Sequence, residues 1–271
     1  MNPNQALWEK GDFTAIARTM RQSGEAVVSS LGIAAPLRVL DLGCGDGTTA
    51  VPLAQLGADV VGIDIANNLV EAGRRRAAQA GLARLTFRHG DACDLQGVDD
   101  DHFDIALSVF CAMFAPRPFD VAKEMVRVTK PGGRVVMGNW IPNDPTSFVS
   151  QLLRISSSFT APPPEGFVSP MTWGVESHIV ERFGKAGVPA ERIAMARDTF
   201  VFRAPDLTPA EFIDVFRKYY GPTMNAFEAA AAKGAEDELH GQLVELANTQ
   251  NGGAGRGVSI PATYMRVSVQ M

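Results

Sequence analysis

The sequence is poor in the residues that mark secreted, metal-binding and membrane-spanning proteins. Its 271 residues include three cysteines and four histidines, and the cysteines form no C-x-x-C pair. Cysteines scattered in this way predict buried thiols in a reducing compartment, and neither disulfides nor a metal site is expected. No apolar run approaches the roughly 18 residues that span a bilayer. We therefore expect no membrane insertion.

Positive charge is also scarce, with 25 basic against 30 acidic residues and a net charge of −5. The Arg74–Arg76 triplet falls within a helical pattern and predicts a solvated helix face. Proteins dedicated to nucleic acids carry a basic stripe, so nucleic acid is not expected as a partner. Residues 1–5 show no basic segment leading into an apolar core, which predicts no signal peptide and a cytoplasmic location.

Glycine, in contrast, is concentrated where the first strand is expected. Residues 38–42 form a short apolar run, glycines follow at 43, 45 and 47, and a helical pattern begins at Thr48. This order predicts a buried strand, a tight turn and a helix. Glycines allow positive φ and let a ligand approach the backbone, and the helix directs free N–H groups at the turn. The stretch therefore predicts a site for a small, partly polar ligand.

The spacing of these glycines separates two kinds of ligand. The dinucleotide fingerprint reads G-x-G-x-x-G, whereas here the third glycine comes one residue early. Asp41, just before the first glycine, would repel a pyrophosphate but could accept hydrogen bonds from an ammonium group or from the turn. A nicotinamide-dependent oxidoreductase is therefore a less favoured alternative.

A second buried strand, Asp59–Asp64, ends in a carboxylate. At that position of an α/β nucleotide site, an acidic residue binds the ribose hydroxyls, and its two oxygens match a vicinal diol. NAD and S-adenosylmethionine both contain such a ribose. Asp64 could instead cap the helix that begins near Asn67.

Several motifs together resemble one family, the class I S-adenosylmethionine-dependent methyltransferases. The stretch from Val39 to Gly47 resembles the first motif of that family, and Gly90-Asp91-Ala92-Cys93 resembles its motif beside the adenine. Lys130-Pro131-Gly132-Gly133 resembles its late structural motif. The pattern over residues 38–140 is most similar to the ubiquinone/menaquinone-type C-methyltransferases and related small-molecule enzymes.

The resemblance implies an α/β fold with a Rossmann-like, seven-stranded, mostly parallel sheet. Helices would cover both faces, the last strand would be antiparallel, and further helices would be added near the C-terminus. Residues 1–35 would form a helical cap and 36–140 the cofactor-binding core. Residues 141–271 would complete the sheet within the same domain, with insertions at 141–173 and 208–250 that shape the acceptor pocket.

The resemblance also implies which residues contact S-adenosylmethionine. Ser108 to Phe114, at the end of the fourth strand, would line the reaction centre, while Trp8, Asp12 and Phe13 could close the site. The expected cofactor-binding residues are Phe13, Asp41, Gly43, Cys44, Gly45, Asp64, Ile65, Asp91, Ala92, Cys93 and Ser108.

The predicted function is methyl transfer from S-adenosylmethionine to carbon or oxygen of a small-molecule acceptor. His178 and Tyr264 are candidate bases, with Tyr219 and Tyr220 behind them, although each could be structural. A regulatory protein that binds the cofactor without turnover is the second alternative. The acceptor half of the chain identifies neither the substrate nor the oligomeric state.

Overall fold

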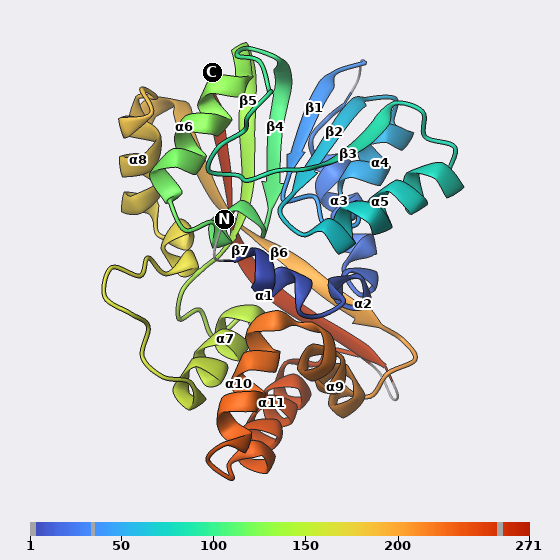
Figure 1. Ribbon diagram of the computed structural model, residues 1–271, viewed down its shortest axis with the longest axis vertical. Helices are drawn as coiled ribbons and strands as arrows, with labels where there is room; N and C mark the ends of the chain where they lie inside the picture. The colour runs from blue at the N-terminus through green and yellow to red at the C-terminus, as the bar shows by residue number, and fades with distance from the viewer. Residues whose placement is uncertain (1–3, 34–35, 254–256) are drawn as a thin grey trace.

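The fold is built on a seven-stranded sheet with strand order β3-β2-β1-β4-β5-β7-β6 (Figure 1). The computed structural model describes residues 4–33, 36–253 and 257–271. Six strands are parallel, and β7 is antiparallel to both of its neighbours. The predicted sheet is therefore confirmed. The strands are β1 Arg38–Leu42, β2 Asp59–Asp64, β3 Leu85–His89, β4 Phe103–Val109, β5 Thr129–Trp140, β6 Ile193–Ala204 and β7 Val258–Gln270.

Helices cover both faces of this sheet because alternate strand residues point in opposite directions. Val39 and Leu107 face a core that includes residues of α3, α4 and α5, whereas Leu40 and Met137 face a core that includes residues of α6 and α8. The α-helices are α1 Gln5–Glu9, α2 Phe13–Arg18, α3 Arg21–Ser30, α4 Ala50–Gln55, α5 Asn67–Gln79, α6 Pro118–Val128, α7 Phe148–Phe159, α8 Glu176–Lys185, α9 Pro209–Tyr219, α10 Gly221–Ala231 and α11 Glu236–Gln250; short 3₁₀ helices are η1 Ala112–Phe114, η2 Pro170–Gly174 and η3 Ala190–Arg192.

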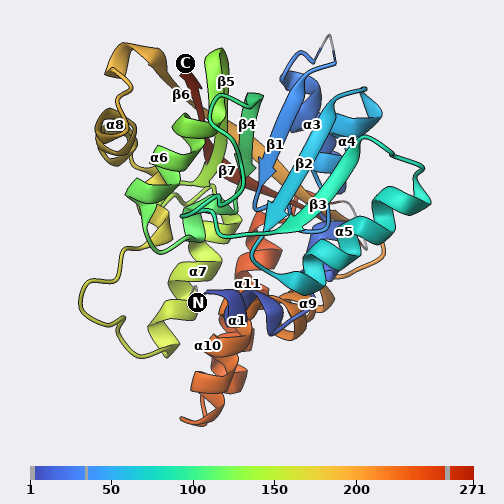
Figure 2. The same cartoon turned by 45° about the horizontal axis from the view of Figure 1, so that its top comes forward.

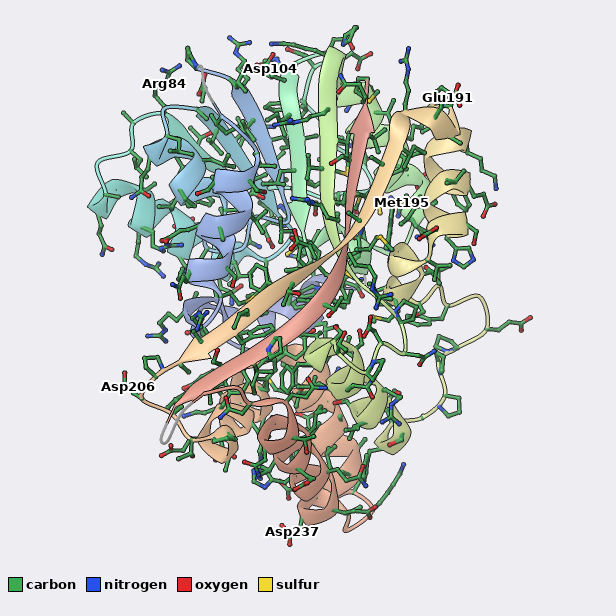
Figure 3. The ribbon with its side chains drawn as sticks, turned by 180° about the vertical axis from the view of Figure 1, so that it is seen from behind. Arg84, Asp104, Glu191, Met195, Asp206 and Asp237 are labelled. Atoms are coloured by element: carbon green, nitrogen blue, oxygen red, sulfur yellow. The ribbon has the colours of Figure 1, made fainter. Side chains whose placement is uncertain are left out.

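Strands β6 and β7 continue past the rest of the sheet and carry the added helices (Figure 3). β6 is the one strand that pairs with residues 258–263 of β7, which also form an isolated bridge from Ala262 to Ser147, and the pairing of β7 with β5 begins at Tyr264. Helix α7 and helices α9 to α11 pack together beside this extension. The alternating pattern of residues 264–269 predicts a final strand that begins at Tyr264. It begins six residues earlier, because the extension around Pro261 needs only one partner strand, and a proline without an N–H is tolerated there.

The N-terminal segment crosses from the strand ends to the added helices (Figure 2). Its described residues form three helices, whereas the apolar spacing of residues 16–31 predicts one or two. Helices α1 and α2 contact α5 on one side and α9 or α10 on the other. The glycine-rich stretch 252–255 predicts a loop, of which residues 254 and 255 lie outside the described residues.

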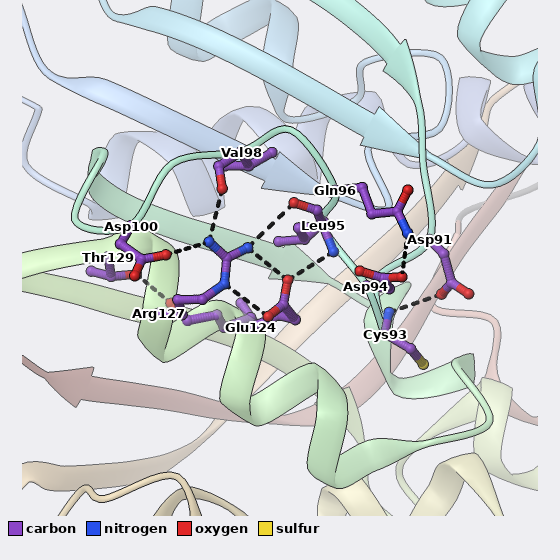
Figure 4. A network of polar contacts seen from close by, with 11 residues as sticks. Asp91, Cys93, Asp94, Leu95, Gln96, Val98, Asp100, Glu124, Arg127 and Thr129 are labelled. Carbon is purple, nitrogen blue, oxygen red and sulfur yellow. Dashed lines mark hydrogen bonds and ion pairs between the residues drawn. The ribbon is translucent and has the colours of Figure 1, made fainter.

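The chain between β3 and β4 is held in place by one arginine of α6 (Figure 4). Arg127 donates from Nη1 to the carbonyl oxygen of Val98 and to Asp100, and from Nη2 to the carbonyl oxygen of Leu95, at 2.6 to 3.3 Å. It also binds both oxygens of Glu124, and Glu124 accepts from the backbone N–H of Leu95. Paired in this way, the Arg127 guanidinium holds the pKa of Glu124 below its ordinary value.

Replacing Arg127 with methionine is expected to lower the free energy of unfolding by about 1–3 kcal/mol, since several charge-assisted hydrogen bonds are lost at a partly buried position. Urea denaturation would measure the change. Arg117→Met is the matched control, because Arg117 forms an exposed pair with Asp120 and should change stability by less than about 1 kcal/mol. Equal losses in the two variants would contradict the anchoring role of Arg127.

Candidate functional site

The glycine turn between β1 and α4 folds back over the end of β2. Its three glycines have φ values of +73°, +54° and +90°, which side chains with a Cβ rarely adopt. The N–H groups of Gly43 and Cys44 donate to the carbonyl oxygen of Ile63 at 2.7 and 3.2 Å. The turn is therefore anchored on the neighbouring strand.

Two of these glycines are needed for different reasons. A Cβ at Gly43 would lie 2.1 Å from the Cβ of Cys111, so the chain after β4 can approach β1 only at a glycine. A Cβ at Gly45 would meet no other atom within 4 Å. Gly45 therefore faces open space, where another molecule could lie against the backbone.

Asp64, the last residue of β2, accepts hydrogen bonds from the backbone of the glycine turn and of the segment before α5. Its Oδ2 accepts from the N–H of Gly45 at 2.8 Å, and its Oδ1 accepts from the N–H of Ala66 at 2.9 Å, just before α5. Burial raises the pKa of Asp64 above its ordinary value. A carboxylate offers about four acceptor positions, so each oxygen of Asp64 can still accept a hydrogen bond from a ligand hydroxyl.

Asp41 lies behind the turn and is 1% exposed. Its Oδ2 accepts from Thr49 Oγ1 at 2.6 Å, which joins the end of β1 to the start of α4. Loss of water, with a smaller contribution from Asp64, raises the pKa of Asp41 from 3.8 to about 7. Asp41 does not line the cavity beside the turn.

Two arginines hold Asp46, the residue between the second and third glycines. Arg21 of α3 donates to the Asp46 carboxylate and to the Thr48 hydroxyl. Arg76 of α5 donates to the Asp46 carbonyl oxygen at 2.6 Å, and burial lowers the pKa of Arg76. Helices α3 and α5 thus fix the turn from both sides.

A cavity extends from this turn. One end is formed by the glycine turn, the end of β2 and the start of the loop that follows β3. The other end is mostly aromatic and apolar. The first end is lined by Leu42, Gly43, Gly45, Ile63, Asp64, Ile65, Leu69, Gly90 and Ala92; the second by Asn4, Trp8, Phe13, Ile16, Met20, Phe110, Cys111, Ala112, Phe114, Ala115, Trp140, Val149, Phe202, Phe216 and Tyr220.

Phe110, one of the residues that line the aromatic end, has an unusual backbone. Its φ is +60°, a strained value for a residue with a bulky side chain. Its N–H donates to the carbonyl oxygen of Gly138 at 2.9 Å, and its ring stacks on Trp140 with 3.6 Å between centroids. This contact holds the chain after β4 against the end of β5.

The N-terminal segment closes the cavity and is fastened to both sides of it. Glu9 Oε1 accepts from the backbone and side-chain nitrogens of Asn67 at 2.9 and 3.0 Å. Lys10 Nζ donates to Asn225 and Glu228 of α10 at 2.6 and 2.7 Å. Between these contacts, Trp8 packs edge-on against the rings of Phe13 and Phe114.

The structure brings six of the expected cofactor residues into the cavity wall: Phe13, Gly43, Gly45, Asp64, Ile65 and Ala92. Asp41, Cys44, Cys93 and Ser108 lie outside that wall. Ser108 Oγ accepts from the N–H of Ala112 at 3.0 Å and so shapes the chain after β4. Asp12 caps α2 through the N–H of Thr14.

Asp91 lies at the same edge of the sheet as the cavity. Its Oδ1 accepts from the N–H of Cys93 at 2.8 Å (Figure 4). It lines a second cavity, beside Arg88 and Arg117, that shares Ile63 and Gly90 with the first.

The candidate bases are not brought together. Tyr264 is 2% exposed and its hydroxyl donates to Asp198 at 3.3 Å, outside the cavity wall. His178 lies on α8 and does not line the cavity. Of the four candidates, Tyr220 alone is among the lining residues.

Sequence reasoning missed most of the aromatic end, including Trp140, Phe202 and Phe216. Trp140 ends β5 at the same edge where Asp64 ends β2. The rule that ligands lie beyond the carboxyl ends of parallel strands would have found it. Phe202 and Phe216 carry no comparable signal, because they reach the cavity from β6 and α9 through tertiary packing.

A family model described as a methyltransferase domain matches residues 40–137. Together with the sheet order, the glycine turn and Asp64, this match defines the class: the chain belongs to the class I S-adenosylmethionine-dependent methyltransferases. S-adenosylmethionine is the cofactor of this class. The nicotinamide alternative is therefore set aside.

Individual relatives give the extent of the similarity. Rv1403c of Mycobacterium tuberculosis, an uncharacterized protein, is 32% identical over 231 residues, which cover 84% of this chain and 80% of that protein. Demethylmenaquinone methyltransferase of Clavibacter sepedonicus is 44% identical over 100 residues, covering 37% of this chain and 40% of the relative. The crystal structure of the YcgJ protein of Bacillus subtilis shares the fold, with a TM-score of 0.57 at 20% identity over 91% of this chain and 97% of that one.

In the described part of the chain, no helix has the length and apolar character needed to cross a membrane. Nor does that part contain a group of three or more His, Cys, Asp or Glu side chains placed to hold a metal ion.

The raised pKa of Asp41 predicts a pH-dependent stability. Because the folded protein binds this proton more tightly than the unfolded chain, the stabilisation is full below pH 3.8 and is lost as pH rises through about 7. Asp41→Asn stays neutral throughout. The free energy of unfolding of the wild type relative to this variant should therefore fall by about 2–3 kcal/mol from pH 5 to pH 8, at about 1.4 kcal/mol per pKa unit.

Urea denaturation without cofactor at the two pH values measures this difference. The exposed Asp99→Asn serves as the control and should show a constant difference from the wild type. A difference for Asp41→Asn that is equally constant would show that the carboxyl is ionised at pH 5.

Proposed function

We propose that the enzyme methylates a small, largely apolar molecule at carbon or oxygen, and that the cavity at the glycine turn holds both cofactor and acceptor. The observation that carries this proposal is the continuity of the cavity from Gly45 and Asp64 to the aromatic end. The predicted insertions contribute to that end, with Val149 from 141–173 and Phe216 and Tyr220 from 208–250.

The cofactor end fits S-adenosylmethionine. The open side of Gly45 leaves room for a ligand against the backbone, and the remaining acceptor positions of Asp64 match the two ribose hydroxyls. Ile65 and Ala92 offer apolar surface for the adenine, with Asp91 and the Cys93 backbone at its polar edge. In this proposal Asp41, Cys44 and Ser108 act by shaping the turn and the chain after β4.

When bound, S-adenosylmethionine supplies a methyl group on a positively charged sulfur that leaves as a neutral thioether. The chain's own contribution is to align the acceptor and to exclude water, which Trp8, Phe13 and Phe114 do at the cap. Among the described residues lining the aromatic end, there is no carboxylate, histidine or lysine. The acceptor is therefore one that brings its own activated nucleophile, such as a phenolate or an enolate.

The enclosure of the cavity beneath the N-terminal segment, with the net charge of −5, favours a small molecule over a nucleic acid. All three cysteines are thiols, of which two are buried. This agrees with a reducing compartment, and we propose the cytoplasm.

Gly45→Ala tests the cofactor end of the cavity. The new methyl group would occupy the open space at the turn, so the affinity for S-adenosylmethionine measured by calorimetry should fall at least about tenfold, equivalent to about 1.4 kcal/mol. Gly81→Ala is the matched control, with a φ of +64° against +54° and no atom within 4 Å of its added Cβ. Both variants should lose about 1–2 kcal/mol of stability through backbone strain. Unchanged affinity in Gly45→Ala would place the cofactor elsewhere.

Release of S-adenosylhomocysteine tests the acceptor class. The purified enzyme would be incubated with S-adenosylmethionine and, separately, with apolar phenols, naphthols, hydroquinones and enolisable ketones, and with transfer RNA and duplex DNA. We expect release above background with at least one of the small apolar molecules, and less release with Gly45→Ala at the same subsaturating concentration of S-adenosylmethionine. Release with a nucleic acid, and with no small molecule, would contradict the proposal.

A further inference from the structure

Tyr220 is held rigidly in the wall of the aromatic end. It is the residue between α9 and α10 and is 4% exposed. Its ring contacts Phe216, Trp8 and Phe13 with centroids 5.5, 5.9 and 6.1 Å apart. The rings of an added helix and of the N-terminal cap therefore fix where its hydroxyl lies.

That hydroxyl makes no hydrogen bond with any described residue. Tyr264, by contrast, donates to Asp198. Thr223 Oγ1, in the same segment, is a fully enclosed polar atom without a partner. The Tyr220 hydroxyl oxygen is not fully enclosed in this way. The Tyr220 hydroxyl is therefore accessible from the cavity that its residue lines. A buried polar group without a partner is costly, so this one is expected to bind a ligand or water.

Apart from the indole N–H groups of Trp8 and Trp140, the other polar side chains at this end are the Asn4 amide and the Cys111 thiol. The Asn4 amide nitrogen donates to the carbonyl oxygen of Phe114. The Cys111 thiol is a weak donor and packs against Gly43. Burial raises the pKa of Tyr220, so its hydroxyl stays protonated near neutral pH and can donate.

We propose that Tyr220 is the positioning residue of the acceptor subsite, and that its hydroxyl donates a hydrogen bond to an oxygen of a ring-sized, largely apolar acceptor. This inference rests on the proposed function and narrows its substrate class. The flat rings of Phe110 and Trp140 hold the apolar part of such a molecule, and Tyr220 fixes its orientation through one carbonyl or hydroxyl oxygen.

A pair of probes that differ by one oxygen tests this role. Tetralin and 1-tetralone share a ring skeleton, and the ketone oxygen of 1-tetralone can accept but not donate. Their affinities would be measured by calorimetry in the presence of saturating S-adenosylhomocysteine, for the wild type, Tyr220→Phe and Tyr219→Phe. Tyr219 is the adjacent tyrosine and does not line the cavity.

The expected readout is the ratio of the two affinities, because a loss of packing alone would affect both probes alike. We expect Tyr220→Phe to reduce the preference for 1-tetralone about fivefold, within the range for one neutral hydrogen bond. Its affinity for tetralin should be unchanged, and Tyr219→Phe should behave as the wild type.

A ratio that is the same in Tyr220→Phe and the wild type would overturn the inference, as would failure of both probes to bind the wild type. The S-adenosylhomocysteine titration that precedes each experiment separates this result from failure of the proposed function. A wild type that does not bind S-adenosylhomocysteine would contradict the cofactor site itself, whereas intact binding with an unchanged ratio would contradict the role of Tyr220 alone.

Discussion

The close approach of Cys111 to Gly43 is the contact on which the site depends. β1 and β4 are neighbours in the sheet, and the strand order reverses between them, so β2 and β3 lie on one side and β5 on the other. Gly43 follows β1 and Cys111 follows β4, and any side chain at Gly43 would collide with Cys111. Crevices at such a reversal are where open α/β sheets bind ligands. Because Gly43 has no Cβ, Cys111 can pack against it, and this contact forms the base of the cavity.

Different interactions form the two ends of the cavity on either side of this contact. The cofactor end is made of backbone and of Asp64, whose hydrogen bond to Gly45 holds the turn in a shape that leaves its outer side open. The acceptor end is made of large rings from segments far apart in the sequence, packed by apolar burial. The N-terminal cap completes both ends, because Glu9 fastens it to α5 and Lys10 fastens it to α10.

The sequence predicted the cofactor half of the fold well, because its strands are buried runs with clear ends. The apolar runs Asp59–Asp64 and Phe103–Val109 each predict a buried strand, and the structure shows both strands with these bounds. The glycine spacing predicted the turn, because positive φ strongly favours glycine and can therefore be read from the residue type. The acceptor half had no such signature: Phe202 and Phe216 enter the cavity through long-range packing, and the hydrogen bond of Tyr264 to Asp198 depends on strand register. Local sequence patterns encode neither long-range packing nor the register of strand pairing.

A crystal structure of the protein with S-adenosylhomocysteine tests the central claim most directly, namely that the cavity at the glycine turn is the cofactor site. We predict the ribose hydroxyls within hydrogen-bond distance of Asp64, the ligand against the open side of Gly45, and the sulfur directed toward the aromatic end. A nucleoside bound instead in the second cavity beside Arg88 and Arg117, with no contact to Asp64, would contradict the account.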